Sequence, residues 1–215
     1  MCYHIQMKRK SIELSFLSLL EEGKETSQKN ISNNVSVSIG FINALIKKFV
    51  KKGIIKIQQA PYKRFIYYLT PQGFSEKAKL VNEYFKDSLT FFKSLRIEFN
   101  NLFKNDKSSE YFLYGTGEVC EIAMLSAQEN KKKISAIIDP DYKEKKYFNY
   151  KVLNKLPQKL INKKIVITSP SNQQLLYYKL KKQLKDNQIL YIKSMCISKK
   201  KPNYNPLSKL RAKNE

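Results

Sequence analysis

The residues between positions 38 and 53 have the types and spacing that suit contact with DNA. At helical spacing, the side of this stretch that faces away from the core carries small residues, one amide and two cations. The amide of Asn43 can read a base edge, and Lys47 and Lys51 can bind phosphates. A slim face of this kind fits a major groove. The DNA contacts predicted on this stretch are Ser38, Gly40, Asn43, Ala44, Lys47, Lys48 and Lys51.

A glycine turn, Gly115-Thr116-Gly117, is the second stretch that could do chemistry. Glycines before a helix N-terminus let backbone N–H groups approach a pyrophosphate, and Asp139, 24 residues after Gly115, stands where an acidic residue takes a ribose hydroxyl. However, Cys120 replaces the third glycine of the usual fingerprint, and Glu118 puts a carboxylate where a phosphate would lie. A dinucleotide, a nucleotide sugar or similar metabolite, and an empty scaffold all stay open. The cofactor-binding residues predicted for such a nucleotide-type ligand are Gly115, Thr116, Gly117, Glu118 and Asp139.

The residue inventory argues against most catalytic and metal chemistry. The chain has one histidine, His4, and three cysteines far apart in the sequence, so a histidine-based triad, a zinc knuckle or a disulfide framework is not expected. We therefore predict no metal site, no catalytic residue and no enzyme. No apolar run approaches the ~20 residues of a membrane span, and we expect a soluble cytoplasmic protein without a membrane partner.

The charge balance points to a polyanionic partner. Lysine and arginine total 41 against 18 aspartates and glutamates, a formal net charge of +23, and double-stranded DNA is the leading candidate. A compositional bias toward lysine and asparagine would give the same total. The placement of the cations therefore decides between the two.

The elements that would position residues 38–53 follow from hydrophobic periodicity and turn signals. Residues 11–22 form an amphipathic helix, Ser27 opens a short second helix, and Ser38 caps the third, on which Ile42, Leu45, Ile46, Phe49 and Val50 face a core. The runs 54–59 and 65–70 are β-branched and aromatic, and they predict a hairpin. The DNA contacts predicted at its tip are Tyr62, Lys63 and Arg64.

A long helix follows this module. It begins at the pair Thr70-Pro71, runs to about Phe103, and carries apolar residues at heptad spacing over its whole length. A helix of this length is ~50 Å long, and the preceding helices and hairpin alone would not cover its apolar side. We therefore predict a homodimer through residues 71–104. The alternative is that this helix folds back on the C-terminal half.

The C-terminal half alternates strands and helices. Strands are expected at 110–114, 134–138, 164–168 and 189–192, with helices at 118–130 and 172–185. This alternation is typical of a small parallel sheet with right-handed crossovers. Residues 193–215 contain seven basic residues and one acidic residue, and they are expected to form a disordered tail that adds non-specific DNA affinity.

Residues 11 to about 103 resemble the MarR-type winged-helix regulators associated with exopolysaccharide gene clusters. The resemblance is carried by Ser27-Gln28, the turn Ser36-Val37-Ser38, Lys52-Gly53-Ile54-Ile55 and the run YYLTPQGFSEKAKL from Tyr67 to Leu80. The C-terminal half is similar to the small Rossmann-like domain that follows the winged helix in some polysaccharide-locus regulators. The resemblance implies an α/β multidomain chain: a winged helix-turn-helix at 1–70, a dimerisation helix at 71–104, a Rossmann-like domain at 105–192 and the tail.

The function expected from these features is that of a dimeric DNA-binding transcription regulator whose C-terminal domain senses a small effector. Two other classes stay open. One is a nucleotide-dependent enzyme with an accessory winged helix, for which Glu118, Cys120 and Asp139 are the only convergent candidates. The other is a non-specific architectural DNA-binding protein, which the high charge and the sparse recognition face favour.

Overall fold

The fold is described from a computed structural model, which covers residues 3–21, 23, 27–60, 64–157, 160 and 163–199, with side chains from residue 9 onward. The chain divides into two compact units, Met1–Phe91 and Phe92–Glu215. Helix α4 (Pro71–Asn105) contains the boundary between them. The mixed α/β fold predicted from the sequence is confirmed, and each unit is described separately below.

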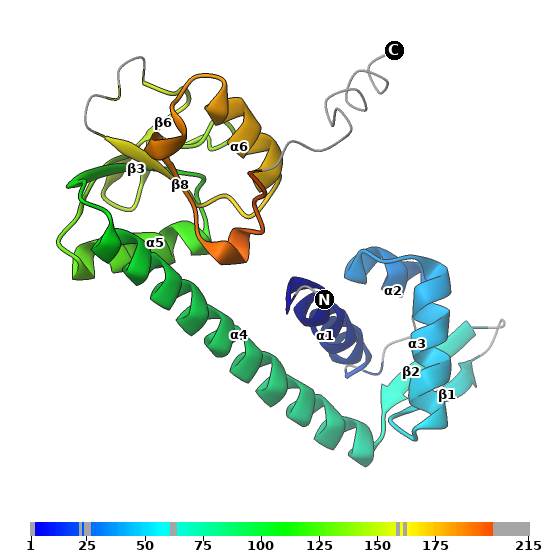
Figure 1. The fold of residues 1–215 in the computed structure, drawn as a ribbon. Coiled ribbons are helices and arrows are strands. Elements are labelled where there is room, and N and C mark those ends of the chain that lie inside the picture. The colour runs from blue at the N-terminus through cyan, green and yellow to red at the C-terminus, as the bar shows by residue number, and fades with distance from the viewer. Residues whose placement is uncertain are drawn as a thin grey trace, which may run out of the picture. The chain divides into compact units, whose positions relative to one another are not determined.

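Unit 1 contains α1 (Tyr3–Leu20), α2 (Gln28–Val35), α3 (Ile39–Lys51), the strands β1 (Ile55–Ala60) and β2 (Arg64–Leu69), and the first part of α4. The two strands pair antiparallel, with Ile55 opposite Leu69 (Figure 1). Helix α1 begins eight residues before the predicted start at residue 11. The order of elements is a helix, a helix-turn-helix and a hairpin, as the sequence predicts.

Short polar residues fix the turn between α2 and α3. The Ser27 hydroxyl accepts a hydrogen bond from the Asn30 amide at 3.1 Å, and the Ser38 hydroxyl accepts one from the Phe41 amide at 3.3 Å, so both serines act as N-caps. Ser36 adopts a left-handed conformation with φ 54° between the helices. Gly53, with φ 68°, follows the end of α3, where a residue without a Cβ is favoured. The ends of the predicted recognition helix are therefore confirmed.

The core of unit 1 is formed by one face of each helix and by the base of the hairpin. Ile42, Leu45, Ile46 and Phe49 of α3 are all buried, and the Phe49 ring stacks on Phe16 with centroids 5.8 Å apart. Val50 is 40% exposed, so the prediction that it faces the core is wrong. Val50 directly follows the buried Phe49 and lies at the side of the buried face of α3.

Thr70 joins the hairpin to α4, and Gly73 lies in the first turn of this helix. The Thr70 hydroxyl accepts a hydrogen bond from the Gly73 amide at 3.0 Å and donates one to the Gly53 carbonyl at 2.6 Å, so it caps α4 and ties it to the end of α3. A Cβ on Gly73 would lie 2.1 Å from the carbonyl oxygen of Ile54. The glycine of the L-T-P-x-G run is therefore required by close backbone packing.

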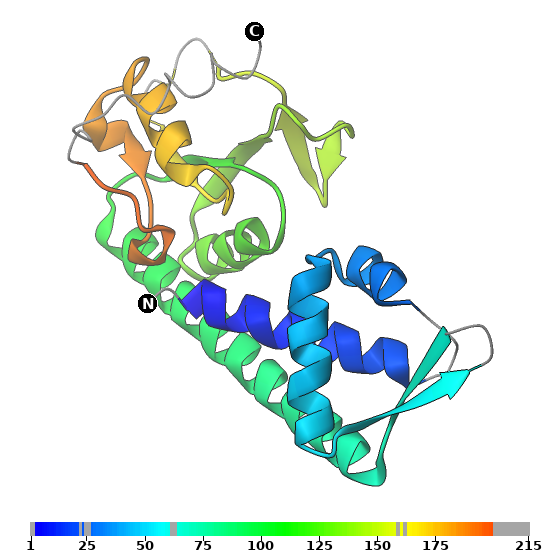
Figure 2. The same ribbon diagram turned by 90° about the vertical axis from the view of Figure 1, so that its right-hand side faces the viewer.

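The first part of α4 presents two different faces. Helix α1 lies beside this part of α4 (Figure 2). The face of α4 toward α1 carries charged residues: Lys10 pairs with Asp87 at 2.7 Å and with Glu83 at 3.3 Å, and Lys77 pairs with Glu21. The other face is apolar and exposed. Its large residues, with their exposed fractions, are Phe74 (47%), Val81 (47%), Phe85 (62%) and Leu89 (43%).

The last part of α4 behaves differently, because it belongs to unit 2. Leu95, Phe99 and Phe103 are buried, and the Phe103 ring meets Tyr111 edge-on at 5.0 Å. The predicted heptad stripe is thus divided. Its C-terminal third packs inside unit 2, in agreement with the alternative that the helix folds back on the C-terminal half. Among the described residues, the part of the stripe before residue 92 stays uncovered.

Unit 2 is built on a six-stranded sheet in the order β5-β6-β4-β3-β7-β8. The strands β3 (Glu110–Tyr114), β4 (Lys133–Ile138), β6 (Tyr150–Leu153), β7 (Lys164–Ile167) and β8 (Ile189–Leu190) are parallel to their neighbours. In chain order these five strands have the arrangement 3-2-1-4-5, which occurs in doubly wound α/β sheets. The additional strand β5 (Lys146–Tyr147) forms a tight hairpin with β6.

Helices cover both faces of this sheet. Helix α5 (Glu118–Glu129) and the end of α4 lie on one face, and α6 (Gln173–Lys181) lies on the other (Figure 1). Tyr111 contacts Phe103 of α4, and the alternate residue Phe112 belongs to the buried cluster that includes Tyr177 of α6. Helix α6 is shorter than predicted. Its N-cap is Asn172 in a left-handed conformation without a side-chain hydrogen bond.

Residues 193–199 are ordered, although the sequence analysis places them in a disordered tail. The Ser194 hydroxyl donates to Glu98 at 2.6 Å, and the Ser198 amide donates to Gln174 at 2.7 Å. Met195 is buried in the short 3-10 helix Lys193–Met195. The sequence does not show these contacts because their partners are distant in the chain. The rest of the predicted tail, residues 200–215, lies outside the described residues.

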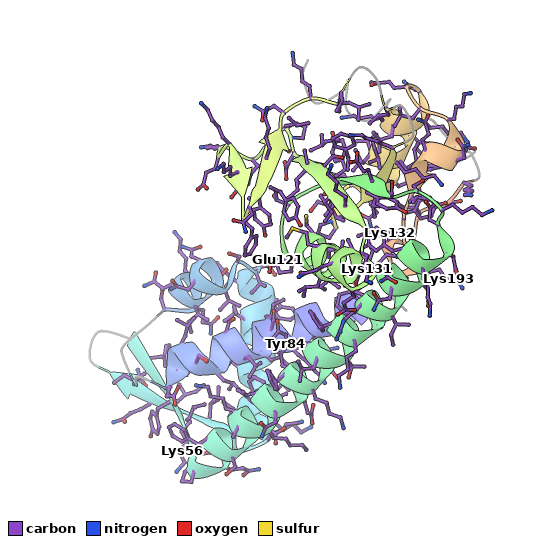
Figure 3. All side chains as sticks on the ribbon, turned by 90° about the vertical axis from the view of Figure 1, so that its left-hand side faces the viewer. Lys56, Tyr84, Glu121, Lys131, Lys132 and Lys193 are labelled. Carbon is purple, nitrogen blue, oxygen red and sulfur yellow. The ribbon has the colours of Figure 1, made fainter. Side chains whose placement is uncertain are left out.

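Asp106 fixes the entry from α4 into β3. Burial alone would raise the pKa of this carboxyl, but hydrogen bonds from Lys164, from Ser108 and from the Tyr111 hydroxyl at 2.9 Å outweigh it and hold the pKa at about 2. Lys132 donates to the carbonyl oxygens of Asp106 and Ser108, both at 2.8 Å (Figure 3). The carboxylate is thus the centre of a local polar network.

This network predicts a defined loss of stability in acid. A lowered pKa contributes stability that is present above pH 4 and is lost as the pH falls from about 4 toward 2. At neutral pH, Asp106→Asn is expected to lower the free energy of unfolding of unit 2 by about 2 kcal/mol. Urea unfolding followed by circular dichroism at several pH values measures this, with Glu118→Gln as the control carboxylate. Equal stability of Asp106→Asn and wild type at pH 7 would contradict the role given to Asp106.

Candidate nucleic-acid interface

The outer face of α3 is slim and positively charged. Gly40, Ala44, Lys47 and Lys51 are all exposed, and they recur at three- and four-residue spacing on the side opposite the buried stripe. Asn43 is half-buried at the margin of this face. The capped N-terminus of α3 lies at Ser38. A convex helix with short side chains in its first turns and lysines farther along has the shape and charge to enter a major groove.

Lys48 has a partner inside unit 1. Its ammonium lies 2.8 Å from the carboxylate of Glu13 and 5.0 Å from the centroid of the Phe49 ring. Only 10% of the Glu13 side chain is exposed, so loss of Lys48 would leave this buried carboxylate with Arg9, at 3.7 Å, as its remaining cationic partner among the described residues. The structure gives Lys48 a part in joining α3 to α1, and its contact with DNA stays a prediction. Nothing in the spacing along the chain indicates this pair.

The hairpin next to α3 is only partly described. Tyr62 and Lys63 lie outside the described residues, and Arg64 is the first residue of β2, with its side chain outside the description. The exposed face of the described strands carries Lys56 and Gln58, and Figure 3 labels Lys56 at this end of unit 1. The three predicted contacts at the hairpin tip therefore stay predictions.

The glycine turn lies at the carboxyl edge of the sheet in unit 2. It follows β3, which lies between β4 and β7 in the sheet. The strand order reverses at β3, and doubly wound sheets bind ligands at the point of reversal. Gly115 has φ 105°, and a Cβ there would lie 2.5 Å from the Cβ of Ser169 after β7. The Thr168 hydroxyl donates to the Gly115 carbonyl at 2.7 Å. The turn is consequently packed tightly against the neighbouring strand.

The structure brings Asp139 to this turn, as the sequence predicts for the end of the second strand. Both the amide and the hydroxyl of Thr116 donate to one oxygen of Asp139, at 2.9 and 2.7 Å. Burial raises the pKa of the Asp139 carboxyl, but these hydrogen bonds outweigh it and keep the pKa below its usual range. Asp139 is therefore charged, with part of its hydrogen-bonding capacity used inside the protein.

A tyrosine that the sequence analysis did not single out completes the turn. The Gly117 amide donates to the Tyr147 hydroxyl at 3.2 Å, and this hydroxyl donates to the Glu121 carboxylate at 2.6 Å. Tyr147 comes from β5, and Glu121 from the first turn of α5. The amides of Thr116 and Gly117, which would face a pyrophosphate, are thus both used by the protein's own side chains. Glu118 is exposed at the start of α5.

The candidate nucleophile of the enzyme alternative is poorly placed for catalysis. Cys120 is completely buried under the turn, and burial raises the pKa of its thiol to about 12. The thiol is therefore protonated at neutral pH, and a reactive cysteine needs the thiolate and access to solvent. Among the described residues, no group of histidine, cysteine and acidic side chains could hold a metal ion, and no described helix is long and apolar enough to cross a membrane.

Comparisons with known proteins give distant likenesses. No protein-family profile matches the sequence, and no curated protein matches it either. Among solved structures, MepR, a transcription regulator of the Staphylococcus aureus multidrug efflux pump MepA, is 14% identical and covers 42% of this chain and 77% of its own, with a TM-score of 0.35. A protein of unknown function from Listeria innocua is 18% identical and covers 42% of this chain and 69% of its own, with a TM-score of 0.34.

A third likeness spans both units. Human N-acetylserotonin methyltransferase in complex with SAM covers 99% of this chain and 82% of its own, at 12% identity and a TM-score of 0.29. Because all three TM-scores are low, the function proposed below rests on the geometry of the chain itself.

Proposed function

We propose that this protein is a DNA-binding transcription regulator that reads DNA with α3 of an N-terminal winged helix. The observation that carries the proposal is the outer face of α3, where Gly40, Ala44, Lys47 and Lys51 are exposed on a helix with a capped N-terminus. Lysines on such a face neutralise phosphates, and the small residues let the helix approach the groove. The formal net charge of +23 supports a polyanionic partner.

In this proposal the regulator is a homodimer. The apolar face of α4 from Phe74 to Leu89 has heptad spacing, is exposed, and lies on a different side of the helix from the ion pairs with α1. A second copy of the same helix would cover it. Two-fold symmetry would then present two α3 helices to half-sites ~34 Å apart. The winged helix would comprise residues 1–70, the dimerisation helix residues 71–104 and a sensing domain residues 105–192.

The sensing domain is proposed for its strand order and for the turn at its centre. A nucleotide-type effector at Gly115-Thr116-Gly117 would have to replace the hydroxyl of Tyr147 on the Gly117 amide and would meet the charged Asp139. This exchange would link ligand binding to the β5–β6 hairpin. We propose that the site binds its ligand without turning it over, since Cys120 is buried and protonated.

Sequence preference provides the test that separates a regulator from an architectural protein. Asn43 is the one amide on the outer part of α3, so Asn43→Ala is expected to lower the preference for the protein's own upstream region over random DNA by ~1 to 3 kcal/mol. The measurement is a fluorescence anisotropy titration with both duplexes at one salt concentration. Equal wild-type affinity for the two duplexes would contradict a sequence-reading regulator and support the architectural reading.

A further inference from the structure

Unit 2 contains a basic cavity at the edge of the sheet opposite the glycine turn. It has a volume of about 550 Å³ and is lined by residues that enter three neighbouring strands: Lys107 before β3, Lys163 and Lys164 at the start of β7, and Lys185 before β8. The strands are parallel, so all these residues lie at their amino ends. The glycine turn and Asp139 follow the carboxyl ends, and the cavity is therefore separate from that site.

Two of the four lysines are held in place by the protein. Lys163 pairs with Glu110 at 2.7 Å and lies 5.6 Å from the centroid of the Phe112 ring, and Lys164 pairs with Asp106. Glu110 also pairs with Lys133 at 2.7 Å, so these ion pairs contain three lysines and two carboxylates. These ion pairs thus fix the positions of the two ammonium groups without a ligand.

The other two lysines have no carboxylate partner among the residues that the structure describes. Lys107 and Lys185 are exposed, and no ion pair joins either of them to another described side chain. Ser109, with a hydroxyl group, and Asn187, with an amide group, also line the cavity. The cavity therefore has an excess of positive charge together with neutral hydrogen-bond donors, and this is the chemistry that binds phosphate groups.

We infer that this cavity is a second phosphate-binding surface of the protein and that it binds the phosphate backbone of DNA. This inference rests on the proposed function. DNA is favoured because the unpaired cations are long, exposed lysines, which bind phosphates as point charges without shape recognition. Contacts of this type carry no sequence information. They increase affinity and the dependence of affinity on salt.

The test compares two variants that each remove two positive charges from unit 2. The first is Lys107→Ala with Lys185→Ala, and the second, as the matched control, is Lys143→Ala with Lys151→Ala, two exposed lysines outside the cavity. Anisotropy titrations with a duplex of about 60 base pairs are made at four salt concentrations. The cavity variant is expected to bind at least ~10-fold more weakly than the control and to lower the slope of log K against log salt by about 2 per subunit.

The outcomes separate this inference from the function on which it rests. If the two variants lose DNA affinity equally while Lys47→Ala still weakens binding, the inference that the cavity binds DNA would be contradicted, and α3 would remain the DNA-contacting helix. No binding by wild type at low salt would overturn the proposed function. If the cavity variant is poorly folded by circular dichroism, Lys107→Gln with Lys185→Gln replaces it.

A second arm distinguishes DNA from a small phosphorylated ligand. Thermal unfolding is followed with and without millimolar sodium pyrophosphate, which would fill the cavity if the site were built for a free phosphate compound. Stabilisation of wild type by pyrophosphate that is lost in the cavity variant, without any change in DNA affinity, would overturn the assignment to DNA. Loss of DNA affinity in the same variant, with little effect of pyrophosphate on wild type, would support it.

Discussion

Replacing both Lys47 and Lys51 with alanine is expected to weaken DNA binding about 100-fold or more at moderate salt. Both side chains are exposed on the outer face of α3, and no described ion pair engages them. Each removed phosphate contact lowers the salt slope by about 0.9, so the slope should fall by about 2 per subunit. The loss should be similar for all sequences, because phosphate contacts position the protein and do not read bases.

The matched control for this variant is Lys79→Ala with Lys86→Ala. These lysines are exposed on α4 in the same unit, and their removal changes the net charge of the chain by the same amount. If binding depended only on overall charge, the two variants would lose affinity equally. That outcome would contradict α3 as the DNA-contacting helix, although it would be compatible with a polyanion-binding protein.

Replacing Phe85 with glutamate is expected to convert the protein to a monomer. Phe85 is 62% exposed at the middle of the apolar face of α4, where a charge at a helix–helix seam would be buried without a partner. The dimer dissociation constant should rise at least ~100-fold. DNA affinity should fall by a factor of the order of 10² to 10⁴, because the second half-site would no longer be bound as part of the same complex.

Ile97→Glu is the control for the dimer interface. Ile97 is on the same helix and is 61% exposed, but it lies in unit 2 on another face of α4. Analytical ultracentrifugation of both variants measures the oligomeric state, and circular dichroism checks that they are folded. A monomeric wild type, or a Phe85→Glu variant that remains a dimer, would contradict the proposed use of this face.

The local features of the fold were predictable from the sequence, because the residues that cause them are neighbours in the chain. Ser38 caps α3 through the amide of Phe41, three residues later, and Gly53 ends the same helix with a left-handed backbone. Apolar periodicity identified the strands β3 and β4 and the helix between them. In this way the sequence also placed Asp139 at the glycine turn, since parallel strands end at the same edge of a sheet.

The features that the sequence did not predict depend on contacts between distant residues. The ion pair of Lys48 with the buried Glu13, 35 residues earlier, is one of them, and the predicted DNA contact of Lys48 stays a prediction. Tyr147 belongs to a lysine- and tyrosine-rich segment, and nothing in its local pattern shows that its hydroxyl reaches Gly117. Likewise, heptad spacing runs through the whole of α4, but only packing in three dimensions decides that Leu95 and Phe99 are covered by unit 2.

The most direct test of the central claim is a titration of the wild-type protein with its own upstream DNA over a range of salt concentrations. If α3 enters the major groove, binding should be tight at low salt, should exceed binding to random DNA, and should weaken linearly in a plot of log K against log salt. Undetectable binding at low salt would contradict the claim that this protein is a DNA-binding regulator.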